Sequence, residues 1–564
     1  PKIYNLTNKI IMKKILPLLL LICACSAPKV EKIYYNGIIW TGNLSNPSAS
    51  ALAVGNEQIL FVGNDNETLE MASPETEKIN LMGRFVTPGL IDNHVHFMSG
   101  GFQLSSVDLR DVDNKAEFQK RIVAHAESLP KGAWMLGGDW DHELWGGNYP
   151  DKSWIDDVLL DRPVFLGRLD GHMALANSKA LELAGINSST LDPVGGIVLK
   201  DSQGSPTGIL KDEAMALVNK VVPEYSIEEM DQALDAAMQF ALSLGITQIH
   251  DMGTWESLET YKRNYKNGRL KIRIKIYPWY TNWKKIIRNV QNNGPGDEWL
   301  RWDGIKGMMD GSLGSRTAWM HKPYLNDTFS SEKEELPTVG IITLKDTTEF
   351  KHILRETDKA NIQHAVHAIG DQANDWILDE FASIKEEFGQ KDRRCRIEHA
   401  QHLSKSAVPR FAAENIIPSM QPYHIFDDGS WAYKRIEHDR LSRTYVFKTL
   451  IESGANLTFG SDWTVAPFNP VTGIYAAITR HTRDGKNPSG WYPNEKISVE
   501  DALRSYTINN AYAAFWEKTT GSILIGKHAD FVVHSTNFLT ARPEQILESK
   551  VMRTVVGGKD YIFD

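Results

Sequence analysis

The chain has 564 residues, of which 42% are hydrophobic and 24% charged, so it is long enough for a large globular protein with more than one structural part. Its formal net charge of −9 provides no basic stripe, which argues against nucleic acid as a partner. Three cysteines are too few for a disulfide framework, so any metal site has to use histidine, carboxylate and lysine side chains.

The first 31 residues have the features of a targeting segment. Two lysines after Met12 precede the apolar run 15–22, which has the length of a signal peptide and is too short to cross a bilayer as a mature helix. The following residues, ending at Cys25, resemble the lipobox of bacterial lipoproteins. We predict that residues 1–31 form a leader, a lipoprotein signal and a tether, and that a lipid on Cys25 anchors a periplasmic or cell-surface protein. An uncleaved signal anchor is the alternative.

Short strands and tight turns are predicted at both ends of the chain. Residues 34–40 carry an Asn-Gly hairpin pattern between β-forming residues, and residues 51–63 have the pattern of a second hairpin. A similar texture returns in residues 521–533. We therefore expect one small β-sandwich built from both termini, with residues 32–85 as its first part and 516–564 as its second.

The middle of the chain alternates between strand and helix patterns. Ser226 and Glu229 form a capping box before a helix that Gly245 ends, and residues 246–250 form a short strand. Ser498 opens another helix, which we expect to continue to about Trp516. Such repeated units predict an α/β fold with a parallel sheet and crossover helices.

Residues 100–225 interrupt this rhythm and are rich in glycine, tryptophan and aspartate. They have the character of an insertion after the first strand of the parallel sheet. In a barrel, an insertion at that place overhangs the C-terminal ends of the strands, where active sites lie.

His94 and His96 follow an apolar strand that begins after Thr87-Pro88-Gly89. Side chains two residues apart on a strand point to the same face, so both imidazoles can reach one metal ion. Other candidate ligands occur in or at the end of later apolar strands: Lys306, His367, His399 and Asp462. Taken singly, such a histidine can be a core residue and Asp462 can cap the next helix, but the ordered set indicates a metal centre.

These segments resemble the amidohydrolase superfamily, and most closely the YtcJ-like branch that includes N-substituted formamide deformylases. The resemblance covers nearly the whole chain from about residue 32. It rests on these segments: Thr87–His96, Asp170–His172, Asp310–Ala318, His367–Asp371, Ile397–Gln401, Ser419–His424, Gly460–Asp462 and 521–533.

The resemblance implies a (β/α)8 TIM barrel over residues 86–515, and one or two divalent metal ions, with zinc favoured by the ligand types. His94 and His96 would hold the more buried ion, and His367 and His399 the second. Asp462 would be both a metal ligand and the catalytic group that takes the proton of the attacking water.

Lys306 would carry a carbamate derived from CO2 that bridges two metal ions, as strand-four lysines do in many relatives. The chemistry requires a neutral amine, which burial near cations favours. The alternative is an ordinary lysine paired with Asp310 or another acid.

Further positions are predicted around this centre. His424 is a candidate donor to the developing oxyanion, and therefore the second predicted catalytic residue. Candidate substrate-binding residues are Trp140, Asp170, His172, Asp310 and Arg316. For His424 and Arg316 a loop-stabilising role is the alternative, and for Trp140 a packed loop is the favoured alternative.

The function expected from these features is hydrolysis of a carbon–nitrogen bond, other than a peptide bond, in a small molecule by metal-activated water. Two alternatives stay open: an aminohydrolase that deaminates a ring at the same site, and a surface binding protein that has lost its chemistry. No motif selects the substrate. A homodimer is compatible with the sequence, which leaves the oligomeric state open.

Overall fold

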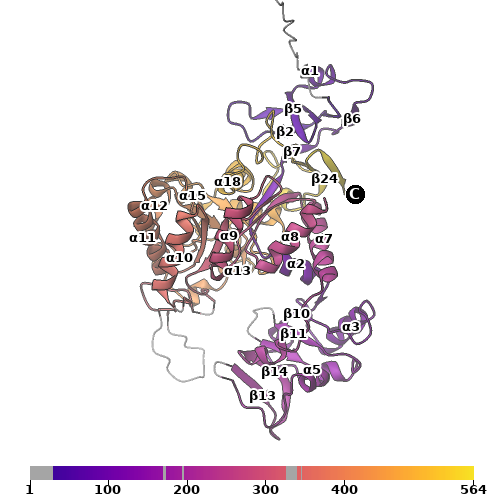
Figure 1. Cartoon of the computed structure of the whole chain (residues 1–564), viewed down its shortest axis with the longest axis vertical. Coiled ribbons are helices and arrows are strands. Elements are labelled where there is room, and N and C mark those ends of the chain that lie inside the picture. Colours follow the sequence, from indigo (N-terminus) through magenta and orange to yellow (C-terminus); the bar gives the residue numbers. More distant parts are fainter. Residues whose placement is uncertain are drawn as a thin grey trace, which may run out of the picture.

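The structure, a computed structural model, describes residues 29–168, 173–193, 196–314, 316–325, 339–344 and 346–563. The predicted leader and Cys25 therefore lie outside the described residues. Within the described part of the chain, no helix has the length and apolar character needed to cross a membrane. Figure 1 shows three parts along the long axis: a β-rich part that includes the C-terminus, a central α/β body, and a second β-rich unit at the opposite end.

Two parallel sheets form the core of the central body. The first has the strand order β17-β16-β15-β8 and the second the order β18-β19-β20-β21-β22. Isolated parallel bridges, Trp279 to Lys306 and Val95 to Trp463, join the two sheets at both junctions. The result is a TIM-barrel-like arrangement carried by two sheets. Its strands are β8 (Leu90–Val95), β15 (Ile246–Asp251), β16 (Arg273–Ile276), β17 (Leu300–Arg301), β18 (Gly304–Met308), β19 (Gln363–Ala368), β20 (Arg396–His399), β21 (Ile417–Met420) and β22 (Thr458–Phe459).

Helices surround these sheets in the central body (Figure 1). They confirm the predicted alternation of strands and helices. The longer ones are α2 (Phe97–Leu104), α7 (Ile227–Ser243), α8 (Trp255–Lys266), α9 (Trp283–Asn293), α10 (Thr347–Lys359), α11 (Asp371–Phe388), α12 (Ala407–Glu414) and α16 (Pro470–Thr479). Shorter ones are α13 (His424–Asp428), α14 (His438–Leu441), α15 (Phe447–Glu452), α17 (Val499–Ser505) and α18 (Ile508–Ala513).

Helix α7 forms for the reasons read from its sequence. Ser226 and Glu229 make the reciprocal capping box, which satisfies free amide groups at the helix start. The alanines and leucines at helical spacing are buried against the neighbouring strands and helices. Gly245, with a φ of 78°, adopts the left-handed conformation that ends the helix before β15 begins.

The helix predicted from Ser498 to about Trp516 is wrong in its length. The structure divides it into α17 and α18, with a break at Thr507 where φ is −133° and ψ is −89°. The break lets the buried Asn510 side chain donate hydrogen bonds to the carbonyl oxygens of Ile91 and Phe459. A tertiary contact with β8 and β22 therefore overrides the local preference for one continuous helix.

Strands from both ends of the chain share one sheet. This six-stranded sheet has the order β25-β24-β23-β7-β2-β3, and a four-stranded sheet of order β5-β4-β1-β6 shares a buried cluster with it. The strands are β1 (Lys32–Tyr35), β2 (Ile38–Trp40), β3 (Ser48–Ala49), β4 (Ala51–Gly55), β5 (Gln58–Gly63), β6 (Glu77–Asn80), β7 (Phe85–Pro88), β23 (Phe531–His534), β24 (Val551–Val556) and β25 (Lys559–Ile562).

One of the two predicted N-terminal hairpins is confirmed and the other is wrong. β4 and β5 pair as an antiparallel hairpin, with Gly55 opposite Gln58. β1 and β2, on either side of Asn36-Gly37, do not pair: β1 joins β4 and β6, while β2 joins β3 and β7. The turn residues bend the chain as expected, but the two strands join different sheets: β1 the four-stranded sheet and β2 the six-stranded one.

The segment between α2 and α7 forms a unit with its own six-stranded sheet, ordered β13-β14-β12-β11-β10-β9, and its own buried clusters. It occupies the lower end of Figure 1. Its elements are β9 (Val107–Asp108), α3 (Lys115–Ala126), β10 (Gly137–Trp140), α4 (Ser153–Asp156), β11 (Phe165–Arg168), β12 (Met173–Ala176), α5 (Ser178–Leu183), β13 (Gly196–Lys200), β14 (Pro206–Asp212) and α6 (Met215–Asn219).

Candidate metal centre

The predicted ligands gather at the C-terminal ends of the strands of the central body. Their positions are His94 near the end of β8, His96 directly after it, Lys306 within β18, His367 near the end of β19, His399 at the end of β20 and Asp462 shortly after β22. Parallel strands of a barrel present their C-terminal ends on one face. Residues up to 368 positions apart in sequence therefore meet in one place.

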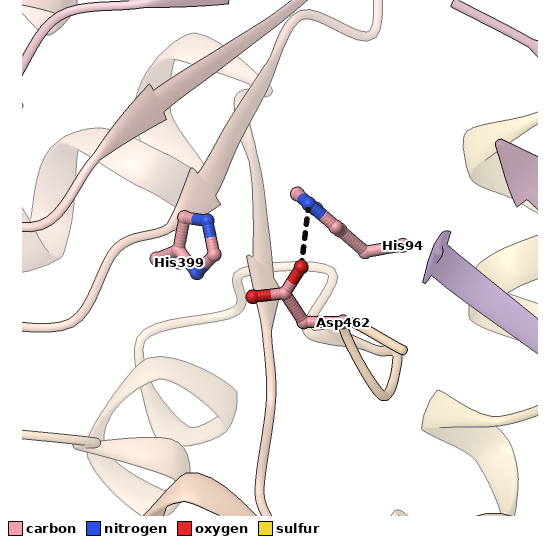
Figure 2. Close-up of side chains that lie close together, drawn as sticks. All are labelled: His94, His399 and Asp462. Atoms are coloured by element: carbon pink, nitrogen blue, oxygen red, sulfur yellow. Dashed lines mark ion pairs between the residues drawn. The ribbon is translucent and has the colours of Figure 1, made fainter. Parts of the chain in front are cut away.

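His94, His399 and Asp462 form the centre of this group (Figure 2). All three are buried, and one donor atom from each lies within 4.8 Å of the others. His94 Nε2 is 3.5 Å from Asp462 Oδ1, and the His94 and His399 ring centroids are 4.9 Å apart. Two ligands that are each about 2.1 Å from one tetrahedral zinc ion are separated by about 3.4 Å. The spacing therefore suits ligands that share an ion.

His96 and His367 each lie close to one member of this trio: His96 to Asp462 and His367 to His399. His96 Nε2 is 3.4 Å from Asp462 Oδ1, on the same carboxylate that His94 approaches. The ring centroids of His367 and His399 are 4.4 Å apart, and His367 Nε2 faces the Gly311 carbonyl oxygen at 3.1 Å. The structure thus brings the pair His94 and His96 close to the pair His367 and His399. Asp462 contacts the first of these pairs.

Left-handed backbone conformations direct two of these side chains. His399 has a φ of 73° and Asp462 a φ of 60°, values that non-glycine residues adopt at a cost of roughly 1–3 kcal/mol. On β20 the side chains of Arg396 and Glu398 lie on one face, so regular alternation would turn His399 away from it. The left-handed turn at His399 brings its ring back toward His94.

Lys306 lies beside His94, with 3.2 Å between Nζ and His94 Nε2. It is only 2% exposed. Burial lowers its pKa to about 8, while Glu398 and Asp462 act in the opposite direction. Asp310, which the alternative interpretation paired with Lys306, instead bonds to backbone groups.

The charges at the centre favour neutral imidazoles beside an ionised carboxylate. Burial lowers the pKa of His94 to about 4 and holds that of His399 well below its usual value. Burial alone would raise the pKa of Asp462, but the hydrogen bond from His96 holds it well below its usual range. Neutral imidazoles and an ionised carboxylate are the protonation states that bind a divalent cation.

His424 begins α13, four residues after β21 ends. Its ring stacks parallel to that of His399, with centroids 6.5 Å apart. Its Nε2 is buried and has no hydrogen-bond partner among the described residues. A buried polar atom next to the candidate ligands is available for a bound molecule.

Asp310 and Arg316 belong to the loop after β18. The Asp310 carboxylate accepts hydrogen bonds from the backbone N–H groups of Ile369, Gly370 and Trp319, so it organises the loops around the centre. Arg316 has a φ of 59° in the same loop. Their predicted contacts with substrate stay predictions.

Of the substrate-binding residues predicted in the inserted unit, Trp140 lies among the described residues, and it is packed inside that unit. Trp140 is fully buried, donates to the Leu166 carbonyl oxygen at 2.8 Å and stacks on Trp145. This position matches the packing alternative for Trp140. Asp170 and His172 lie outside the described residues.

The structure adds residues that sequence reasoning missed: Arg396, Glu398, Ser419 and Gln421. Glu398 accepts a hydrogen bond from His94 Nδ1 at 2.6 Å. The sequence held one clue, since the charged residues Arg396 and Glu398 lie two positions apart in a short strand and must share one face of it. Which residue they contact across the barrel could not be read from that pattern.

The residues present fit a divalent metal ion. The donor set combines imidazoles and a carboxylate, which suits zinc and similar ions. His399 Nδ1 is buried without a hydrogen-bond partner among the described residues, as expected of a nitrogen that needs a ligand.

The amidohydrolase family model named Amidohydro_3 matches residues 77–560. The chain is 39% identical over 93% of its length to the protein LONG AFTER FAR-RED 3 of Arabidopsis thaliana, covering 90% of that protein. It is 29% identical to the putative amidohydrolase YtcJ of Bacillus subtilis, covering 94% of this chain and 99% of YtcJ. It is 26% identical to the N-substituted formamide deformylase of Arthrobacter pascens, covering 93% and 96%.

A solved structure has the same architecture. An uncharacterized metal-dependent hydrolase from Pyrococcus furiosus superposes with a TM-score of 0.75 and 28% sequence identity, covering 90% of this chain and all of that one. The chain therefore belongs to the amidohydrolase family, as its motifs indicated. These relatives support a metal-dependent hydrolase at a general level.

Proposed function

We propose that this protein hydrolyses a carbon–nitrogen bond, other than a peptide bond, in a small molecule. The observation that carries the proposal is the buried trio of His94, His399 and Asp462, whose donor atoms lie within 4.8 Å of one another. The relative named N-substituted formamide deformylase supplies the first substrate class to test, because such an enzyme releases an amine and formate.

Asp462 is the proton carrier in this proposal. Its carboxylate is ionised and lies within 3.5 Å of both His94 and His96, so it can accept a proton from the attacking water and pass it to the leaving nitrogen. His424, whose buried Nε2 has no hydrogen-bond partner in the described part of the chain, donates a hydrogen bond to the oxygen that becomes negative as water adds.

The residues that would hold the metal are His94, His96, His367, His399 and Asp462. A bound zinc or similar ion supplies Lewis acidity, which lowers the pKa of water and polarises the substrate carbonyl. We propose that Lys306 adds a ligand as a carbamate, formed when its neutral amine bonds to CO2 and releases a proton. Its nitrogen lies 3.2 Å from His94 Nε2, within the same group of donors.

We also propose the finer organisation that the sequence predicts. Residues 86–515 would form a (β/α)8 barrel, residues 100–225 an insertion over its catalytic face, and the two terminal segments one β-sandwich. The supporting observations are the two bridges between the parallel sheets and the mixed origin of the six-stranded sheet. A lipid on Cys25 would anchor the protein at the periplasmic or outer face of a membrane.

The deciding experiment measures metal content and turnover on the same purified protein. We expect one or two zinc-type ions per chain and release of amine and formate from an N-substituted formamide. A cyclic amide and an aminated purine complete the panel, and ammonia release from the purine would identify a deaminase instead. The His399→Ala variant should lose metal and turnover, whereas His125→Ala, on α3 in the inserted unit, should keep both. A metal-free, inactive wild-type protein would refute the proposal.

A further inference from the structure

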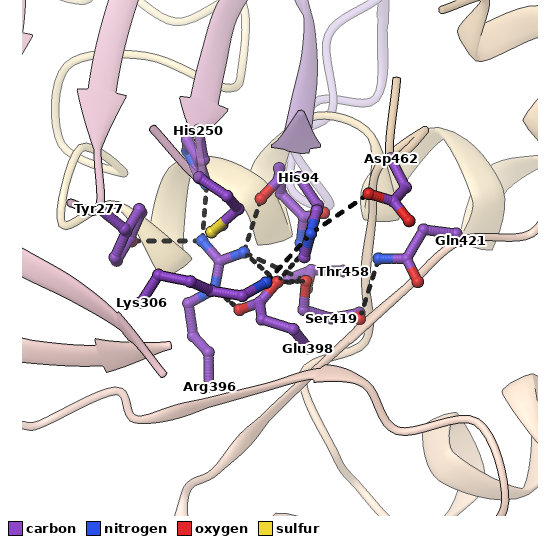
Figure 3. Close-up of polar contacts among 12 residues, drawn as sticks. His94, His250, Tyr277, Lys306, Arg396, Glu398, Ser419, Gln421, Thr458 and Asp462 are labelled. Atoms are coloured by element: carbon purple, nitrogen blue, oxygen red, sulfur yellow. Dashed lines mark hydrogen bonds and ion pairs between the residues drawn. The ribbon is translucent and has the colours of Figure 1, made fainter. Parts of the chain in front are cut away.

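A network of buried charged and polar groups contacts His94 at Nδ1, the ring nitrogen that Glu398 approaches (Figure 3). Glu398 and Arg396 of β20 form its core and are both 0% exposed. Arg396 Nε donates to Glu398 Oε1 at 2.8 Å, and Arg396 Nη2 donates to Glu398 Oε2 at 3.0 Å. This two-pronged ion pair fixes the plane of the carboxylate.

Glu398 faces His94 from this fixed position. Its Oε2 accepts hydrogen bonds from His94 Nδ1 and from the Ser419 hydroxyl, both at 2.6 Å. Together with the two bonds from Arg396, the carboxylate accepts four hydrogen bonds, about its full capacity. Glu398 is therefore occupied by protein groups, although it lies one residue before a candidate metal ligand.

Arg396 is held in turn by groups from other strands. Its Nη2 donates to the Asn93 carbonyl oxygen at 2.6 Å, and its Nη1 approaches His250 Nδ1 at 2.9 Å and the Tyr277 hydroxyl at 3.2 Å. These contacts connect β8, β15, the end of β16 and β20. The guanidinium cannot move away from Glu398 without losing several of them.

This arrangement determines which nitrogen of His94 carries the proton. Since the ionised Glu398 can only accept, His94 Nδ1 must be protonated, and Nε2 keeps its lone pair. Nε2 is the atom beside Lys306 Nζ, at 3.2 Å, and beside Asp462, at 3.5 Å. The lone pair thus lies on the side where the other candidate ligands converge.

We infer that Glu398 is a positioning residue for the metal centre: it holds His94 in the Nδ1-protonated tautomer, while Arg396 and Ser419 hold the Glu398 carboxylate in the position where it accepts from His94. The inference rests on the proposed metal-binding function of His94. Partners of this kind behind a ligating histidine typically change metal affinity 10-fold to 100-fold when they are removed.

The first test uses the metal-free protein labelled with ¹⁵N-histidine, with the His94 signals identified by their loss in His94→Gln. We expect the chemical shifts of Nδ1–H and an unprotonated Nε2 for the wild type. We expect a substantial Nε2-protonated population in Glu398→Ala. A wild-type His94 protonated at Nε2 would overturn the inference, whether or not the protein binds metal.

The second test measures zinc affinity by competition with a chelator. Glu398→Gln keeps the size of the side chain and removes its charge, and we expect about tenfold weaker binding. The matched control is Glu380→Gln, which removes the charge of another buried glutamate paired with an arginine, Arg355, on the outer helices. The control should lose stability without losing zinc affinity.

Each result has a separate meaning. Equal zinc affinity in Glu398→Gln and the wild type contradicts the inference but leaves the hydrolase proposal standing. A wild-type protein that binds no zinc contradicts the hydrolase proposal, while the tautomer measurement still tests the inference. If Glu398→Gln does not fold, Ser419→Ala replaces it, with about threefold weaker binding expected because one of four bonds to the carboxylate is lost.

Discussion

Two buried lysines on neighbouring parts of the barrel-like core, Lys275 and Lys306, are in opposite situations. Lys275 is 0% exposed and donates to Gln363 Oε1 at 2.6 Å, and its Nζ is 3.2 Å from an Asp303 carboxylate oxygen. Lys306 is 2% exposed, and its Nζ forms a hydrogen bond with Nε2 of the neutral His94 imidazole.

The side chains that the two lysines contact lie at different ends of the strands. Asp303 and Gln363, which contact Lys275, stand at the starts of β18 and β19, whereas His94 lies near the end of β8. A buried charge that is fully paired contributes to a defined structure, and its partners tolerate little change. A buried amine without an acid against it is available for chemistry or for a ligand. One end of the core, around Lys275, is therefore structural, and the other end, around Lys306, is functional.

The largest effect is expected at the functional end, from Asp462→Asn. The amide cannot accept the proton of the attacking water, so turnover should fall by about 10²–10⁴-fold. The control is Asp235→Asn, which should keep wild-type activity. Asp235 is an exposed carboxylate of α7 that pairs with Lys271. The measurement is the rate of amine release from the best substrate of the panel. Equal activity of both variants would remove Asp462 from the mechanism.

The comparison itself is tested by changing each lysine to methionine. Lys275→Met leaves Asp303 with one cation fewer in a buried place, so the free energy of unfolding should fall by about 3 kcal/mol while metal content stays unchanged. Lys306→Met should change stability by less than about 1 kcal/mol, because Glu398 and Asp462, the buried acids that interact with Lys306, keep their closer partners, and it should lower metal content.

Chemical denaturation of the metal-free proteins and metal analysis of the loaded ones give the two readouts. Similar losses of stability in both variants, with metal content retained in both, would show that the two lysines have the same structural role.

A smaller effect concerns a buried imidazole away from the centre. His534 of β23 is bonded to the Thr87 hydroxyl, and burial lowers its pKa to about 3. The unfolded chain protonates His534 near pH 6.5, so its stabilising effect is complete above that pH and is lost as the pH falls toward 3. The stability advantage of the wild type over His534→Gln should shrink by about 1.4 kcal/mol per pH unit between pH 6 and pH 4.

Urea denaturation at several pH values measures this slope. A difference that does not depend on pH would mean that His534 is not preferentially neutral in the folded state. The same experiment marks His534 as a structural histidine, in contrast to the histidines at the metal centre.

The amino-acid sequence determined the features that depend on local geometry. His94 and His96 share a face because side chains alternate along a strand, and the capping box at Ser226 set the start of α7. The order of polar residues at the ends of apolar strands was enough to predict a metal centre, since parallel strands of one sheet end on the same side.

Only the tertiary structure decided which distant groups meet. Glu398 contacts His94 across 304 positions, and Asn510 breaks the predicted helix to reach β8 and β22. Asn36 starts a turn, but sheet packing sends its two strands to different partners. Lys275 and Lys306 look alike in sequence, since each follows an isoleucine within a short strand. Their roles differ because, among the described residues, Lys275 is in ion-pair contact with a buried acid whereas Glu398 and Asp462 act on Lys306 from a longer distance. Pairing across a barrel leaves no trace in the local sequence pattern.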